Sequence, residues 1–300
     1  MQKGVTKTLL EYDSTLIKEG KVDLSLSLTN QELVLKSKEE LPEKLRNMLV
    51  STYSDVLEFE ITNDLIILQA EKGRFDDWNN LGGGLAIKNQ GVPGENCSSD
   101  PIARKGTEYY LLTAGHCFFP TGSMVYQFDE TVGQEYALAN EIGYDVGLIR
   151  VSGVNTLSGG RLATNGILVS NFSSSGYDNS FNRTADVYEG LPVCKSGYQT
   201  NHTCGVIIEK YDTMVDDNGN ILNVVLVEGT GANYSTGGDS GGITISNNTE
   251  GVGSHAVLGT HSGGVDTTTA TYGAFTRIVD TMRIYGVDIH VSSTSARIVY

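Results

Sequence analysis

A serine lies inside a short glycine-rich segment, Gly238-Asp239-Ser240-Gly241-Gly242, and this segment constrains the chain more than any other. Glycine adopts backbone angles that other residues avoid, so the segment predicts a tight turn whose N–H groups converge on one point. A hydroxyl held in such a turn needs partners to react. Upstream, His116 precedes Cys117, and Asp145 stands at the head of an apolar run. Together these side chains offer a nucleophile, a base and a group that orients the base.

The chemistry of a serine nucleophile explains why all three are needed. A serine hydroxyl is a weak nucleophile at neutral pH, so a nearby base must accept its proton, and a third group must fix the tautomer of that base. His116 and Asp145 can fill these roles for Ser240. Each of the three motifs alone is often structural. Their joint occurrence in the order His, Asp, Ser predicts a catalytic triad.

Four segments between Leu81 and Ile289 carry a resemblance. They are Thr113-Ala114-Gly115-His116-Cys117, Asp239-Ser240-Gly241-Gly242, Val193-Cys194-Lys195-Ser196-Gly197 followed by Cys204-Gly205, and Phe275-Thr276-Arg277-Ile278 with Tyr285-Gly286-Val287. In this order they resemble the chymotrypsin-like serine peptidase family, and within it the streptogrisin and α-lytic protease branch. The resemblance implies an endopeptidase that works through an acyl-enzyme. It also implies that the backbone N–H groups of Gly238 and Ser240 form the oxyanion hole.

The fold that the resemblance implies is all-β, with two six-stranded antiparallel barrels and a short C-terminal helix. The residues agree, because short apolar runs after Leu81 alternate with clusters of Gly, Asn, Ser and Asp that favour turns. We expect the helix over Asp280 to Tyr285. The expected strands include Tyr109 to Thr113, Val146 to Val151, Val206 to Glu209, Ile221 to Val227, Gly242 to Ile245 and Val257 to Thr260.

Four cysteines allow three pairings, and four free buried thiols remain the alternative. The resemblance implies disulfides between Cys97 and Cys117 and between Cys194 and Cys204, and hence a secreted, extracellular protein. A third disulfide that related enzymes have near the nucleophile is missing, because Thr236 stands where a cysteine often occurs. The first residues do not lead into an apolar stretch of signal-peptide length, so we expect a truncated start.

The charge balance limits the partners. The formal net charge is −15, and no cluster of Lys and Arg occurs, which argues against nucleic acid. No run is long enough for a transmembrane helix. The five histidines lack a paired metal-ligand spacing, so we expect no cofactor and no metal, although a calcium ion at Asp212, Asp216 and Asp217 stays open without support. The expected partners are protein or peptide substrates of a monomer.

Residues 1–80 differ from the rest, with little glycine and no cysteine. Val22 to Leu28 alternates as a half-buried strand, Leu41, Leu45, Met48 and Leu49 share a helical face after Pro42, and Val56 to Ile61 predicts another strand. By resemblance this small α+β unit is a pro-region that assists folding, inhibits the enzyme and makes the chain a zymogen. An unrelated N-terminal domain or a substrate-binding module is the alternative. Residues 71–80 look like an exposed linker, with processing near Asn80 and Leu81 and a peptidase domain over 81–300.

Two further features concern the site. By resemblance, Asp239 is buried and needs a cation, and we expect Lys195 to pair with it, although arginine would bind a carboxylate with better geometry.

Substrate should bind along Ser262-Gly263-Gly264 by strand addition, with Ser262 also hydrogen-bonded to Asp145. In glutamate-specific relatives a histidine at the position of His261 helps to bind the substrate carboxylate, and Ser235 could add a hydroxyl. Tyr234 at the expected base of the pocket is unusual. A preference for Glu or Asp therefore competes with apolar or broad specificity, and a non-catalytic binding module of the same fold is the third possibility.

Overall fold

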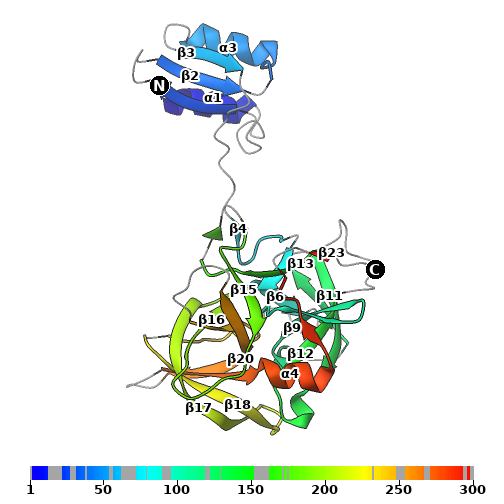
Figure 1. Cartoon of the computed structure of the whole chain (residues 1–300). Helices are drawn as coiled ribbons and strands as arrows, with labels where there is room; N and C mark the ends of the chain where they lie inside the picture. Colours follow the sequence, from blue (N-terminus) through cyan, green and yellow to red (C-terminus); the bar gives the residue numbers. More distant parts are fainter. Residues whose placement is uncertain are drawn as a thin grey trace. The chain divides into compact units, whose positions relative to one another are not determined.

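The structure is a computed structural model of the chain, and it divides into two compact units, Met1–Ala70 and Glu71–Tyr300 (Figure 1). The described residues are 2–12, 22–27, 32–37, 39–53, 57–61, 72–78, 80–89, 96–118, 122–128, 130–151, 162–170, 172–173, 176–231, 233–247, 254–266, 271–292 and 296–297.

The first unit is a three-stranded sheet with two helices. Strand β2 pairs antiparallel with β1 and parallel with β3, and α3 connects β2 to β3 as in a βαβ unit. Leu45 and Leu49 on α3 are buried, whereas Met48 is largely exposed. The expected strands and helix are present, but the first helix and the central strand were not predicted. The elements are α1 (Gln2–Tyr12), β1 (Val22–Ser27), β2 (Glu32–Ser37), α3 (Glu43–Tyr53) and β3 (Leu57–Ile61).

The second unit begins with an antiparallel barrel. Its strands follow the order β8-β9-β12-β11-β10-β6-β7. Strands β7 and β8 are two halves of one bent segment, because Ser99 bonds back to Leu85 beside β6, whereas Asp100 bonds to Leu112 on β9. This segment closes a six-stranded barrel. The strands are β6 (Ala86–Asn89), β7 (Asn96–Ser98), β8 (Ile102–Lys105), β9 (Glu108–Thr113), β10 (Met124–Gln127), β11 (Glu130–Leu138) and β12 (Gly147–Arg150).

The second barrel has six antiparallel strands in the order β19-β16-β17-β18-β21-β20, and the pairing of β19 with β20 closes it. The expected fold of two six-stranded barrels is therefore confirmed. Buried apolar side chains fill it, with Val193, Val225 and Phe275 among them. The strands are β16 (Pro192–Gly197), β17 (Asn201–Val215), β18 (Ile221–Gly229), β19 (Ile243–Ser246), β20 (His255–Asp266) and β21 (Thr271–Arg277).

Short elements complete this unit. The connection between the barrels contains β13 (Leu162–Ile167), β14 (Phe172–Ser173) and β15 (Asn179–Thr184), and β13 pairs with β5 (Asn80–Gly83) and with β23 (Ala296–Arg297). The C-terminal helix α4 (Ile278–Tyr285) starts two residues before its expected position. After it, β22 (Asp288–Ile289) returns to the first barrel and pairs with β8. No helix in the described part of the chain is long and apolar enough to cross a membrane.

The expectation of an exposed linker over residues 71–80 is wrong. Glu71 and Asn79 lie outside the described residues, but the segment between them belongs to the second unit. Strand β4 (Lys72–Gly73) pairs with β14, and the side chains of Arg74 and Trp78 are buried. The side chain of Arg74 donates to residues of the second barrel, whereas that of Asp76 accepts from Gly73 within the segment itself.

Candidate active site

The three predicted side chains come from three short segments of the two barrels. His116 lies in the 3₁₀ helix η1 (Gly115–Cys117) directly after β9, and Asp145 lies in the turn that leads into β12. Both positions belong to the first barrel. Ser240 lies in the turn before β19 of the second barrel. The pairing of β9 with β12 brings His116 and Asp145 to the same end of the first sheet.

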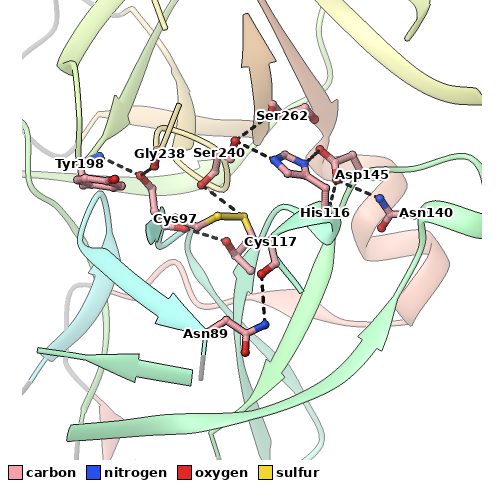
Figure 2. Close-up of a disulfide and its surroundings, with 12 residues drawn as sticks. Asn89, Cys97, His116, Cys117, Asn140, Asp145, Tyr198, Gly238, Ser240 and Ser262 are labelled. Carbon is pink, nitrogen blue, oxygen red and sulfur yellow. Dashed lines mark hydrogen bonds and ion pairs between the residues drawn. A yellow bond between two sulfur atoms is a disulfide. The ribbon is translucent and has the colours of Figure 1, made fainter. Parts of the chain in front are cut away.

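These side chains form one hydrogen-bonded line, which Figure 2 shows. His116 Nε2 lies 2.9 Å from Ser240 Oγ, and His116 Nδ1 lies 2.8 Å from Asp145 Oδ2. Because an ionised carboxylate only accepts hydrogen bonds, Nδ1 carries the proton and Nε2 is left to accept from the serine hydroxyl. The backbone N–H of His116 also donates to Asp145 Oδ1, over 2.9 Å. The arrangement suits proton transfer from Ser240 to His116.

The surroundings of Asp145 keep it ionised. Its side chain is fully buried, and burial alone would raise its pKa, but the charge and hydrogen bonds of His116 outweigh this and place the pKa below its ordinary value. Asn140 Nδ2 lies 3.3 Å from Oδ1. The expected hydrogen bond from Ser262 is not formed in full: its hydroxyl is close enough to favour the charged carboxylate but lies outside hydrogen-bond geometry.

The same pair shifts His116 in the opposite direction. Burial lowers the pKa of the imidazole. The charge of Asp145 and the hydrogen bond to it raise the pKa by more than burial lowers it, so the pKa of His116 lies above the ordinary 6.5. The ring remains 40% exposed, as a group that must exchange protons requires. Asp145 therefore both orients the ring and stabilises its protonated form.

The turn over residues 238–242, here named the nucleophile turn after the role expected of Ser240, has the backbone that its glycines predicted. Gly238 has φ +103° and Gly241 has φ +81°, and a side chain at Gly238 would overlap the ring of Tyr198. Within the described part of the chain, the backbone N–H groups of Gly238 and Ser240 donate to no other group. They are thus available to an oxygen bound beside Ser240 Oγ.

Ser98 braces this turn and was not predicted. Its backbone N–H donates to Ser240 O over 2.7 Å, and its hydroxyl donates to Gly238 O over 2.9 Å. The backbone N–H of Tyr198 donates to the same hydroxyl. The only sequence signal was its position directly after Cys97.

Behind the turn, Lys195 and Asp239 form a fully buried ion pair with Nζ 3.0 Å from Oδ2. Burial lowers the pKa of Lys195, and burial would raise that of Asp239, but the lysine charge and hydrogen bonds hold the Asp239 pKa below its ordinary value. Further donors to the carboxylate are the backbone N–H groups of Gln199 and Thr200, each at 3.0 Å, and that of Thr236 at 3.1 Å. The pair thus ties the nucleophile turn to the β16–β17 hairpin.

Both disulfides that the resemblance implied are present. Cys97–Cys117 joins β7 to the segment that carries His116, and Cys194–Cys204 links directly opposed residues of β16 and β17. No described cysteine is free. A cavity of about 390 Å³ lies beside the first disulfide and is lined by His116, Gly238 and Ser240 among others.

The expected substrate-binding residues lie together on the other side of Ser240. Among the described strands, Ser262, Gly263 and Gly264 lie beyond the pairing of β20 with β19 and face only β21. Ser262 O accepts from Ser240 Oγ at 3.2 Å. The buried Ser235 Oγ lies 2.6 Å from His261 Nε2.

His261 is held neutral. Burial is the main reason that its pKa falls to about 3, and the nearby Lys195 charge adds to the effect. The ring of Tyr234 stands edge-on to the imidazole with centroids 6.1 Å apart, so it forms part of the wall. Ser235 lies against the expected substrate-binding edge, because a Cβ at Gly264 would lie 2.8 Å from that of Ser235.

No protein-family model matches the chain, and no curated protein matches it. Solved structures do. Thermobifida fusca protease A is 23% identical with a TM-score of 0.53, covering 71% of this chain and 100% of that protein. Nocardiopsis protease is 23% identical with a TM-score of 0.55, covering 70% of this chain and 99% of that protein. A glutamic acid-specific serine protease, described as using a histidine triad in substrate binding, is 25% identical with a TM-score of 0.53, covering 70% and 100%. This likeness confirms the expected fold.

Proposed function

We propose that this chain is a serine endopeptidase of the chymotrypsin type. The observation that carries the proposal is the continuous line from Ser240 Oγ through His116 to Asp145, with separations of 2.9 and 2.8 Å. The fold shared with solved serine proteases supports it. Acyl transfer requires a nucleophile, a base with its orienting acid, and hydrogen-bond donors for the oxyanion, and the triad with the backbone N–H groups of Gly238 and Ser240 supplies all of these.

The chemistry follows from the geometry. Ser240 Oγ attacks the peptide carbonyl while His116 Nε2 accepts the hydroxyl proton, and the imidazolium then delivers that proton to the leaving amine. Asp145 stabilises the imidazolium. The backbone N–H groups of Gly238 and Ser240 bind the carbonyl oxygen as it gains negative charge. Water repeats the sequence on the acyl-enzyme and releases Ser240.

The preferred residue before the cleaved bond is Glu or Asp. When the proton of neutral His261 is on Nε2, the ring donates to Ser235 Oγ, and the Ser235 hydroxyl is free to donate to a substrate carboxylate. Hydrogen bonds to a charged group contribute about 1.5–3 kcal/mol each. The glutamic acid-specific relative supports this reading. In this chain the ring of Tyr234 stands edge-on to His261, and Phe275 is the partner of His261 on β21.

An apolar or broad preference is the competing specificity. Tyr234 favours it, because this aromatic ring is buried beside His261. Peptides that differ only in the residue before the cleaved bond separate the two. Equal rates with Glu, Gln and Leu at this position would contradict an acidic preference.

The first unit, residues 1–70, acts as a pro-region of a secreted zymogen in this proposal. Its separate core and its lack of cysteine support a role distinct from that of the peptidase. Barrels held together by contacts between distant residues fold slowly, so a pre-folded assistant would lower the barrier. The two disulfides of the peptidase unit fit an oxidising compartment.

The test uses the full chain. Purified protein is treated with a fluorophosphonate that labels activated serines, and the labelled peptide is identified by mass spectrometry. Ser240 should be labelled, and denatured casein should be cut. Ser240→Ala should lose both properties while keeping its circular dichroism spectrum. A folded wild-type protein that neither labels nor cuts, even after limited proteolysis has detached residues 1–70, would instead be the non-catalytic binding module of this fold.

A further inference from the structure

The segment from Lys72 to Trp78, here named the strap, takes no part in the proposed chemistry, yet it is anchored to both barrels. The backbone N–H of Trp78 donates to Gln127 Oε1 on β10, and Arg74 O accepts from the N–H of Ala86 on β6. Trp78 packs with Leu85 and Leu168, and its ring lies tilted against that of Tyr177 with centroids 4.7 Å apart. Such contacts are those of a structural element and not of a removable linker.

Arg74 is the centre of the strap. Only 3% of its surface is exposed, and its guanidinium donates to four acceptors: Gly84 O at 2.6 Å, Ser196 Oγ and Asn201 Oδ1 at 2.9 Å, and Val169 O at 3.0 Å. Burying a guanidinium is costly unless its donors are satisfied. The protein has therefore built a dedicated site for this side chain.

Gly84 makes that site possible. It has φ +89°, an angle that favours glycine, and an added Cβ would lie 2.7 Å from Arg74 Nη1 and 2.5 Å from Ser196 Oγ. Any larger residue would displace the guanidinium or the serine. Both the conformation and the space at Gly84 thus serve the contact between the strap and β16.

Two of the four acceptors of Arg74 flank the turn between β16 and β17, and this turn binds the nucleophile turn. Ser196 lies at the end of β16 and Asn201 at the start of β17, and between them the N–H groups of Gln199 and Thr200 donate to Asp239. Arg74 thus donates hydrogen bonds to both ends of the β16–β17 turn. Because this turn donates to the buried carboxylate of Asp239, and Asp239 directly precedes Ser240, Arg74 is linked to Ser240 through one carboxylate.

A second strap residue acts on the same turn. The ring of Phe75 meets the ring of Tyr198 edge-on, with centroids 5.1 Å apart. Tyr198 in turn packs directly over Gly238, whose N–H belongs to the proposed oxyanion hole, and it lines the cavity beside Ser240. Figure 2 shows Tyr198 next to Gly238 and the Cys97–Cys117 disulfide.

We propose that Arg74 is a positioning residue for the nucleophile turn, which carries the proposed oxyanion hole, and that the strap belongs to the active enzyme. This inference rests on the proposed function. It replaces the processing site expected near Asn80 and Leu81, because a cut there would release Arg74 from the turn that it holds. Activating cleavage must instead fall before Lys72.

The first test compares Arg74→Gln and Arg74→Lys with Arg104→Gln, a change of an exposed arginine on β8, all in the full chain. Arg74→Gln should lower kcat at least tenfold and leave KM within about threefold, because the nucleophile turn acts mainly on the transition state. Affinity for a peptide boronate should fall in parallel. Arg74→Lys should retain an intermediate kcat, and Arg104→Gln should match the wild type.

The outcomes separate this inference from the proposed function. A wild type without Ser240 labelling, both before and after limited proteolysis has detached residues 1–70, would overturn both. Normal labelling and normal kcat in folded Arg74→Gln, with only a lower melting temperature, would overturn the positioning role alone. The second test does not depend on a variant: the N-terminus of the fluorophosphonate-labelled wild-type enzyme is sequenced. It should lie at or before Lys72, and a fully active species that begins at Leu81 would overturn the inference.

Discussion

Lys195 Nζ and Asp239 Oδ2 lie 3.0 Å apart with both side chains fully buried, immediately behind the residue proposed as the nucleophile. The carboxylate also gathers backbone donors from the hairpin turn and from Thr236. One buried charge pair therefore couples the second barrel's first hairpin to the turn that presents Ser240.

Loss of that lysine should be severe. Lys195→Met leaves a buried carboxylate without its cation, and we expect the free energy of unfolding to fall by about 3–5 kcal/mol. The matched control is Lys210→Met, which breaks a 2.9 Å pair with the half-exposed Asp186 and should cost at most about 1 kcal/mol. Urea denaturation of both variants in the Ser240→Ala background, which prevents self-digestion, gives the comparison. Equal losses of unfolding free energy in the two variants would mean that the buried pair stabilises the protein no more than the exposed pair does.

The pH profile should reflect the shifted pKa of His116. The imidazole must be neutral to accept the Ser240 proton, and its pKa lies above 6.5, so kcat/KM should rise through an acid limb centred above pH 6.5. Asp145→Asn removes the charge that raises the pKa, so the limb should move to lower pH, and the rate should fall roughly ten-thousandfold. Initial rates between pH 5 and 9 provide the check. An unmoved limb in the variant would show that Asp145 does not control this proton.

Ser235 should decide between charged and neutral substrates. In the wild type, a peptide with Glu before the cleaved bond should be cut roughly ten- to hundredfold faster in kcat/KM than its Gln counterpart. Ser235→Ala should remove most of this ratio and leave the Gln peptide nearly unaffected. The Gln peptide is the internal control, since it has the same shape without the charge. An unchanged ratio would assign the selectivity to other residues.

Gly84→Ala should lower the stability of the protein by more than backbone strain alone would. The residue has φ +89° and close neighbours in Ser196 and Arg74, whereas Gly106 has φ +62° and nothing within 4 Å of an added Cβ. Gly106→Ala measures strain alone, about 1–2 kcal/mol. Gly84→Ala should exceed it in loss of melting temperature and should also lower kcat, because Arg74 is displaced. Comparable melting temperatures would contradict the fit between Gly84 and the strap.

Local motifs explain what the sequence could predict. The glycines around Ser240, the histidine before Cys117 and the acid before an apolar strand each mark a short segment, and their order suggested the site that the structure gathers. The barrel strands were recognisable because alternating apolar runs were separated by turn residues. Resemblance added the cysteine pairs and the partner of Asp239.

The strap could not be found in this way. Gly84, Ser196 and Asn201 all contribute acceptors to Arg74, but they are separated by up to 127 positions along the chain from it. No periodicity connects them. The Asp and Asn residues around Arg74 are typical of exposed loops, so composition indicated a linker. Burial of a satisfied arginine depends on tertiary contacts, which composition does not report.

The short strand β22 carries a mechanical implication. After helix α4 leaves the second barrel, Asp288 and Ile289 pair with Arg104 and Ala103 of the first. The C-terminal end therefore connects the second barrel to the first through backbone hydrogen bonds. Detaching β22 from β8 would allow the two barrels to separate. His116 would then move away from Ser240, although neither residue is altered.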